Sequence, residues 1–426
     1  MDLSAVRALK YANFRLYFLG QATSLVGTWM QRMAVSWLVF NLTHSALMLG
    51  LVVFAGQIPI MLLSPYGGAL TDRHNRFKTL LYTQIASMIQ AGLLTAVVLS
   101  KHYNITIIII LSVILGIINA FDTPARQSLM INLVDDKKDL PNAIALNSSM
   151  VTLARLLGPV AAGFILSSFG EGVCFLVNFL SFAAVIASLL LMKIKPEIRQ
   201  PNKQDIWQGL HEGYSYLQQH AGIRSVILLM ACTSFFVMPY STLLPVFATN
   251  IFHGNVTTFS WLNAISGLGA LFGAIYMTTL KPGKSLLKVI AYCSAQFAIS
   301  LILFALTGFF PLALCFIMAA EFGMLSQIAA SNTYIQTHVD ENMRGRVISY
   351  YVMAFQGMQP IGSLLIGFLA HYFGPSLIVC AEGVAGTIAV ICFIPYLKKA
   401  GIEIRSDLRK QLTMSNTKLK PAENGF

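Results

Sequence analysis

Charged residues are scarce in this chain of 426 residues. Only 11% are Asp, Glu, Lys or Arg, whereas 56% are hydrophobic and the mean hydropathy is +0.68. A water-soluble protein of this size needs more charge to cover its surface, so the composition argues against an ordinary soluble protein. It indicates a chain that spends most of its length inside a membrane.

Sequence patterns that mark enzymes and metal sites are also missing. The six cysteines are scattered through apolar stretches without a C-x-x-C pair or a histidine cluster, so neither a disulfide framework nor a zinc site is expected. The chain contains no G-x-S-x-G, no Walker loop and no H-E-x-x-H. We therefore expect no enzymatic activity, no catalytic residues, no cofactor and no metal, and energy for any transport should come from an ion gradient.

Long apolar runs follow one another along almost the whole chain. A helix needs about 20 apolar residues to cross the hydrocarbon core, and helices satisfy every backbone group within such runs. We predict an all-α membrane protein with twelve transmembrane helices. The spans are expected near 14–40, 45–70, 77–100, 104–124, 143–167, 172–193, 224–250, 258–280, 286–308, 311–336, 346–370 and 375–397.

The net charge of +12 is a topology signal. Apart from Lys101, Arg32 and Arg155, the basic residues lie near the two ends of the chain or in the loops that follow even-numbered spans. The positive-inside rule then predicts a multi-pass protein of the inner (plasma) membrane with both termini in the cytoplasm. Nucleic acid is not expected as a partner.

The sequence divides into two related halves around a polar loop. Glycine and phenylalanine at 158, 163–164 and 169–170 recur at 362, 367–368 and 373–374 as glycine and phenylalanine, with one constant offset. This repeat predicts two pseudo-symmetric six-helix bundles, residues 1–193 and 223–397. The loop 194–222 has apolar residues at helical spacing, which predicts an amphipathic helix on the cytoplasmic surface. Residues 398–426 are expected to form a cytoplasmic tail.

The loop after the second span resembles the loop signature of the major facilitator superfamily. Asn75 replaces the second glycine of that signature. Because Asn tolerates positive φ better than most residues, we expect the turn to survive. The residues that carry the resemblance are Gly68, Leu70, Asp72, Arg73, Arg76 and Lys78.

Two further stretches narrow the resemblance. Phe121–Gln127 and Arg344–Val347 are similar to the branch that includes the enterobactin exporter and macrolide-efflux-like proteins, over roughly residues 10–397. The resemblance implies a secondary active transporter that works by alternating access between its two bundles. One departure matters: Ser112 stands near the position of the fourth-helix arginine of drug–proton antiporters, which leaves their proton relay in question.

The resemblance also implies a gate at the cytoplasmic side. Asp72 would accept hydrogen bonds from the helix N-terminus at about 345–348 and hold that side closed, the alternative being a solvated turn. Asp122 and Arg126 are four residues apart and can pair at the membrane edge. The gate candidates are Gly68, Asp72, Arg73, Arg76, Asp122, Arg126, Arg344 and Arg346.

Three charged residues lie deep inside predicted spans. A charge near the bilayer centre costs at least about 2.5–3.5 kcal/mol, so it faces a cavity or a partner. Arg155 suits either an anionic substrate group or a permanent ion pair, and Glu321 suits either proton coupling or pairing with an arginine. Arg32 belongs to a polar stripe that fits either a cavity wall or interhelical hydrogen bonding. The cavity candidates are Gln21, Ser24, Thr28, Gln31, Arg32, Asn119, Arg155, Tyr240, Asn263, Glu321, Gln356 and Gln359.

The leading hypothesis is proton-coupled export of a small amphipathic organic molecule, such as a siderophore or a drug-like compound. The alternatives are import of a siderophore or nutrient by the same fold, and a non-transporting membrane sensor or assembly partner. The expected partners are a small-molecule substrate, protons and membrane lipids. A monomer is expected, with an outer-membrane or biosynthetic partner protein as a further option.

Overall fold

The computed structural model describes residues 3–73, 75–101, 103–193, 206–280 and 285–418. These residues form helices and turns and include no strand. Eleven helical stretches among them are long and apolar enough to cross a membrane. The remaining long helix, α1 (Ala12–Thr43), has 32 residues, and the polar stripe predicted on it lowers its hydropathy. With α1, the described chain contains the twelve spans that the sequence predicts.

Helix bounds agree with the predicted spans to within a few residues at most ends. The first half contains η1 (Leu3–Lys10), α1, α2 (Ala46–Arg73), α3 (Arg76–Leu99), α4 (Ile105–Leu129), η2 (Met130–Leu133), η3 (Lys137–Asp139), α5 (Leu140–Phe169) and α6 (Glu171–Leu190). The second half contains α7 (Ile206–Gln219), α8 (Ala221–Phe236), η4 (Met238–Leu243), α9 (Leu244–Val246), η5 (Phe247–Ile251), α10 (Val256–Thr279), α11 (Leu286–Leu306), α12 (Phe310–His338), α13 (Arg344–Val352), η6 (Met353–Gly357), α14 (Met358–Phe373) and α15 (Pro375–Lys418).

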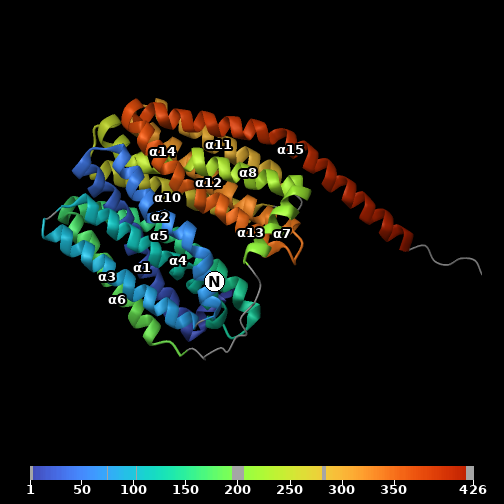
Figure 1. Cartoon of the computed structure of the whole chain (residues 1–426), viewed down its shortest axis with the longest axis horizontal. Coiled ribbons are helices and arrows are strands. Elements are labelled where there is room, and N and C mark those ends of the chain that lie inside the picture. Colours follow the sequence, from blue (N-terminus) through green and yellow to red (C-terminus); the bar gives the residue numbers. More distant parts are fainter. Residues whose placement is uncertain (1–2, 74, 102, 194–205, 281–284, 419–426) are drawn as a thin grey trace, which may run out of the picture.

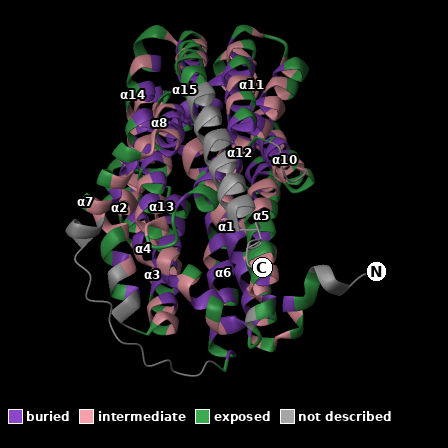
Figure 2. Ribbon diagram, turned by 90° about the vertical axis from the view of Figure 1, so that its right-hand side faces the viewer, coloured by how far each residue is buried: buried purple, intermediate pink, exposed green. Residues whose placement is uncertain are grey.

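The helices form two groups, which follow each other in the sequence (Figure 1). In the first, α1 packs on α5 and α6, α2 on α4, and α3 on α4 and α6. In the second, α12 packs on α10 and α11, while α15 packs on α8 and α11. Buried residues lie inside the groups, and exposed ones lie on their outer faces and ends (Figure 2). Many of the exposed residues are large and apolar, as lipid-facing surfaces require.

The repeated glycines allow equivalent close contacts inside the two bundles. A Cβ on Gly158 of α5 would lie 2.4 Å from the Cβ of Trp29 in α1. A Cβ on Gly362 of α14 would lie 2.1 Å from the carbonyl oxygen of Phe235 in α8. Both contacts need a residue without a side chain. The glycines that end the two helices also share a positive φ, at Gly170 (80°) and Gly374 (84°).

A second pair of repeated glycines lies between the bundles. A Cβ on Gly163 of α5 would lie 2.2 Å from Ser260 Oγ in α10, and one on Gly367 of α14 would lie 2.7 Å from the Ala46 carbonyl oxygen in α2. Gly50 of α2 is equally close, since its Cβ would lie 2.5 Å from the Ser363 carbonyl oxygen. The two halves therefore meet through the seams α5–α10 and α2–α14, with near backbone-to-backbone contact.

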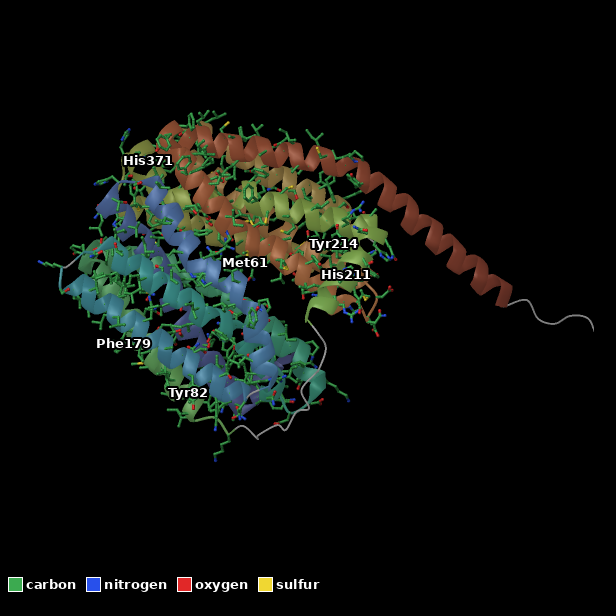
Figure 3. The ribbon with its side chains drawn as sticks, viewed as in Figure 1. Met61, Tyr82, Phe179, His211, Tyr214 and His371 are labelled. Atoms are coloured by element: carbon green, nitrogen blue, oxygen red, sulfur yellow. The ribbon has the colours of Figure 1, made fainter. Side chains whose placement is uncertain are left out.

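These tight contacts lie toward one end of the molecule, the far end, where α1, α5 and α14 finish. The opposite end is called the α7 end, and α7 lies there with His211 and Tyr214 (Figure 3). Met61 lies on the α2–α14 seam between the two ends, next to η6 (Figure 3). Closer to the α7 end, Tyr66 of α2 is 63% exposed and Met353 of η6 is 53% exposed. Close packing between the halves is thus concentrated at the far end.

The amphipathic helix predicted in the loop is α7, and it docks on the start of α13. The Arg346 guanidinium forms an ion pair with Glu212. The Tyr350 hydroxyl donates a hydrogen bond to the Leu210 carbonyl oxygen at 2.9 Å. Gly213 permits this approach, because its Cβ would lie 3.0 Å from the Tyr350 ring. By its contacts, α7 belongs with the second bundle.

An ion pair fastens the N-terminal turn η1 to the start of α5. Lys10 Nζ lies 2.6 Å from Asp139 Oδ2, and the Tyr11 hydroxyl donates to the same oxygen at 3.0 Å. The hydrogen bond from Lys10 holds the pKa of the Asp139 carboxyl below its usual value. The same bond raises the pKa of the Lys10 ammonium.

We expect this contact to be insensitive to pH over the neutral range. A lowered carboxyl pKa gives stability that is complete above about pH 4 and lost as the pH falls through the lowered value. A raised ammonium pKa gives stability that is lost only as the pH rises through it, above about pH 10. Hydrogen exchange of residues 3–10, corrected for intrinsic rates, should agree between about pH 5 and 9. Asp139→Asn should speed exchange throughout, and a pH-dependent difference in the unmodified chain would contradict the assignment.

Candidate functional site

An ion pair joins the two bundles in the middle of their spans. Arg155 of α5 donates from a terminal nitrogen to Glu321 Oε2 of α12 at 2.8 Å. The Tyr240 hydroxyl donates to the other carboxylate oxygen at 2.7 Å. Glu321 and Tyr240 are each 1% exposed, whereas the Arg155 side chain is 25% exposed. We call these three residues the bridge.

Local breaks in the helices position the bridge. Tyr240 lies in η4, where the seventh span leaves α-helical geometry at Val237, just before Pro239. Proline has no backbone N–H and cannot continue an α-helical ladder, so it fits a first turn. On the other side, Gly267 of α10 leaves room for α5, since its Cβ would lie 2.8 Å from the Leu156 Cα. This contact brings Arg155 against the second bundle.

The bridge satisfies a carboxylate that would otherwise be unstable at this depth. Each oxygen of Glu321 receives one hydrogen bond, from Arg155 and from Tyr240. Removing one partner of a buried pair is strongly unfavourable, by about 3–5 kcal/mol. Protonation of Glu321 would remove its charge and leave Arg155 available for another anion. The geometry thus links a carboxylate, a cation and the contact between the halves.

A second arginine lies beside the bridge. The guanidinium carbon of Arg32 lies 4.9 Å from the centre of the Trp29 ring, and that of Arg155 lies 5.8 Å from the same ring. Arg32 is exposed although it lies well inside a span. In the described part of the chain it forms no ion pair, and it interacts electrostatically with Arg155 and Arg126. The sequence analysis missed Trp29, although its place one helical turn before Arg32 is a usable signal.

The polar stripe of α1 has one edge buried inside the first bundle and the other edge exposed. Gln31 lies inside the first bundle, where it accepts a hydrogen bond from Asn178 Nδ2 at 2.7 Å and donates one to Gln90 Oε1 at 3.2 Å. For Gln31 the structure therefore gives interhelical bonding and not a cavity wall. Arg32 lies at the opposite edge of the stripe and is exposed. Between them, Gln21 and Ser24 are buried, and Thr28 donates to the Ser24 carbonyl oxygen.

Four other cavity candidates take no part in the hydrogen bonds of the bridge among the described residues. Asn263 donates to the Phe259 carbonyl oxygen of its own helix at 2.9 Å. Gln356 is exposed in the π-helical turn η6, and Asn119 and Gln359 are half-buried. None of these four side chains hydrogen-bonds to the bridge within the described residues. Arg155, Tyr240 and Glu321 were all predicted as cavity residues from the sequence. The structure places these three in contact with one another.

Three gate candidates of the first half, Asp122, Arg126 and Arg76, form polar contacts within that half. Arg126 lies 3.3 Å from Asp122, as the spacing of four residues predicts. Asp122 is buried and also accepts from Gln84 Nε2 at 2.6 Å. Arg76 donates to the Ser128 carbonyl oxygen at 3.0 Å. The contacts of Asp122 with Gln84 and of Arg76 with Ser128 join α3 to α4.

The latch expected between Asp72 and the start of the eleventh span stays a prediction. The side chains of Asp72 and Arg73 lie outside the described residues. A Cβ on Gly68 would meet no atom within 4 Å. In the other half, Arg346 pairs with Glu212 of α7. Arg344 is half-buried, and its Nε has no hydrogen-bond partner among the described residues.

Asn75 was expected to replace glycine because it tolerates a positive φ, and this explanation was wrong. Asn75 has φ −69°, so the turn does not need a positive φ at this position. Its side chain accepts a hydrogen bond from the Lys78 backbone N–H at 3.1 Å and caps α3. Asparagine suits this position because it is among the best N-cap residues.

The sequence as a whole matches a known family. Residues 3–418 match the model of the family described as transmembrane secretion effector (MFS_3). The chain belongs to the major facilitator superfamily. This membership makes the protein a transporter and not an enzyme, as the sequence predicted.

Relatives of this major facilitator protein support the same branch. It is 28% identical to the staphyloferrin A transporter of Staphylococcus aureus over 367 residues, which are 84% of this chain and 90% of the relative. It is 25% identical to macrolide efflux protein A of Streptococcus pyogenes over 403 residues, which are 90% of this chain and 96% of the relative. The resemblance to the macrolide-efflux-like branch is therefore confirmed.

Solved structures confirm the fold. A mutant of the nucleoside transporter NupG superimposes with a TM-score of 0.70 at 11% sequence identity, covering 91% of this chain and 99% of the transporter. At that identity the likeness concerns the fold alone. It agrees with the predicted all-α membrane architecture of major facilitator proteins.

Proposed function

We propose that this transporter exports a small amphipathic organic molecule with an acidic group, using the proton gradient and alternating access. The bridge of Arg155, Glu321 and Tyr240 carries the proposal, because it ties the two bundles together through a titratable ion pair. Carboxylates buried in spans are typical of proton-coupled transporters. The proposed substrate class includes siderophores and drug-like compounds.

The proposed cycle uses competition for Arg155. While Glu321 is ionised, it holds Arg155 at 2.8 Å and the halves stay joined. In the α7-open state, an acidic group of the substrate displaces Glu321 from Arg155 and binds the guanidinium through its paired donors. Movement of the halves follows, because the bridge no longer opposes it. At the far end the substrate leaves and a proton binds Glu321 in its place, which keeps the bridge broken while the halves return. Release of that proton into the cytoplasm restores the bridge, so one proton enters as one substrate leaves.

The distribution of contacts supports loading from the α7 end. The far end is closed by the glycine contacts, among them Gly163 with Ser260. Ser148 lies seven residues before Arg155, on the same face of α5, and it is exposed. A polar, exposed face that leads from the α7 end to Arg155 fits a passage for substrate. The basic loops of this end are expected in the cytoplasm by the positive-inside rule.

The relatives support export as the direction. One is named a macrolide efflux protein, and another is named a multidrug efflux pump, from Mycolicibacterium fortuitum. A third is named for staphyloferrin A. These names concern those proteins, and they favour a compound made or met inside the cell as cargo here.

Metabolite profiling followed by reconstitution tests the proposal. We expect cells without the protein to retain a compound that cells with it release. In inverted vesicles, an acidic interior should drive uptake of that compound, and collapse of the pH gradient should stop it. Right-side-out vesicles with an acidic exterior supply the control for direction. Uptake into right-side-out vesicles alone would indicate import, and absence of flux in both would remove the transport mechanism.

A further inference from the structure

The described charges at the centre of the molecule do not cancel. Glu321 neutralises Arg155 within the bridge. Arg32 lies beside them and pairs with no carboxylate in the part of the chain that the structure describes. A cation inside a membrane span is held where it meets water or an anion. The centre therefore carries one uncompensated positive charge, and Arg32 is exposed to receive a partner.

Trp29 holds the two cations close to each other. Both guanidinium groups lie within 6 Å of the centre of its ring, at 4.9 and 5.8 Å. The electron-rich face of an indole attracts such cations at about this distance, which offsets the repulsion between them. Gly158 allows α5 to approach α1 at this ring. Trp29 is thus a positioning residue that sets the separation of two anion-binding groups.

We propose that the substrate is a small organic dianion, and that Arg32 with Trp29 forms the subsite for its first acidic group. Arg32 is available at rest, because no carboxylate occupies it within the described chain. Arg155 becomes available for the second acidic group only when Glu321 gives it up. A substrate with one acidic group would leave one of the two cations without an anion. This inference rests on the proposed function and names the substrate class for it.

Binding of two simple probes to the full chain in detergent tests the inference. Benzoate carries one carboxylate, and isophthalate carries two at fixed separation. At constant ionic strength, we expect isophthalate to bind about tenfold or more tightly than benzoate, because it gains a second charge-assisted contact. Arg32→Gln should weaken both probes, because it removes the cation that is available at rest, and should bring their affinities to within about threefold of each other. Arg15→Gln, at an exposed position of the same helix, is the matched control and should keep the preference.

The conservative variant Arg32→Lys controls for a folding defect in Arg32→Gln. It keeps the charge but loses the two-pronged geometry, so an intermediate preference is expected. Equal binding of both probes to the unmodified chain, or an undiminished preference in Arg32→Gln, would overturn the inference. The flux assay fails separately. A dianion preference without gradient-driven flux would support this subsite and contradict the proposed transport. Gradient-driven flux of a compound with one acidic group, without a dianion preference, would support the proposed transport and contradict this subsite.

Discussion

Glu321→Gln is expected to lose proton-driven transport while it keeps substrate exchange. Glutamine resembles the protonated carboxyl, so the variant should stay in the state in which Arg155 is released from its anion. Net flux driven by a pH gradient should fall by about tenfold or more, because in the proposed cycle this carboxylate carries the proton. Exchange of labelled for unlabelled substrate needs no proton step and should continue. Both rates are measured in the same proteoliposomes.

A second buried carboxylate supplies the matched control. Glu382 of α15 is 4% exposed, and neither of its oxygens has a hydrogen-bond partner in the described structure. Glu382→Gln makes the same chemical change outside the bridge and should leave the coupling ratio unaltered. Full gradient-driven flux in Glu321→Gln would remove Glu321 from the proton path. Loss of exchange together with net flux would instead indicate a stability defect from the unpaired Arg155.

Gly50→Ala is expected to open the far end. The added Cβ would lie 2.5 Å from the Ser363 carbonyl oxygen and 3.2 Å from the Gly367 Cα, both of which are backbone atoms that cannot turn aside. Overpacking of this kind costs about 1–3 kcal/mol. This cost raises the free energy of the far-closed state alone. Because about 1.4 kcal/mol corresponds to a factor of ten, the ratio of far-open to far-closed molecules should rise by about tenfold. Transport should slow, because each cycle passes through the closed state.

A cysteine on the other seam reports the opening. Cysteine is close in size to serine, so Ser260→Cys should be tolerated. Ser260 lies on α10 and faces Gly163 of α5, on the seam that Gly50→Ala does not change. In a background without the native cysteines, labelling of this thiol from the far side should increase several-fold with Gly50→Ala. Gly56→Ala, on the same helix, is the control because its nearest neighbour would lie at an ordinary 3.7 Å. Equal labelling in the two variants would show that the α2–α14 contact does not set the equilibrium.

The twelve spans and the central charges could be predicted because both depend on local properties of the sequence. Apolar length defines a span, and a charge inside one demands a partner. Arg155 and Glu321 were each given two interpretations, an ion pair or a functional group. The structure pairs them across the bundles at 2.8 Å, and the proposed coupling uses that pair as a switch.

The surroundings of α1 could not be predicted, because its stripe covers two faces with different neighbours. Periodicity places Gln31 and Arg32 in one arc of about 100°. Whether a residue at the edge of that arc meets α3 and α6 or the opposite bundle depends on how the helix is rotated. That rotation is fixed by contacts distant in sequence, such as Gln31 with Asn178. The same limit applies to Trp29, whose role is visible only once α5 is beside it.

The docking of α7 changes how the two halves are connected. Besides Glu212 and Tyr350, the Tyr216 hydroxyl donates to Asp340 at 3.2 Å, so this helix is bound at several points to the second bundle. In the proposed alternating access, α7 should therefore move together with the second bundle. The connection between the two bodies is then counted from Leu190 to Ile206, and a chain of that many residues spans at most about 55 Å. Its length, and not that of the whole polar loop, limits how far the two bodies separate at the α7 end.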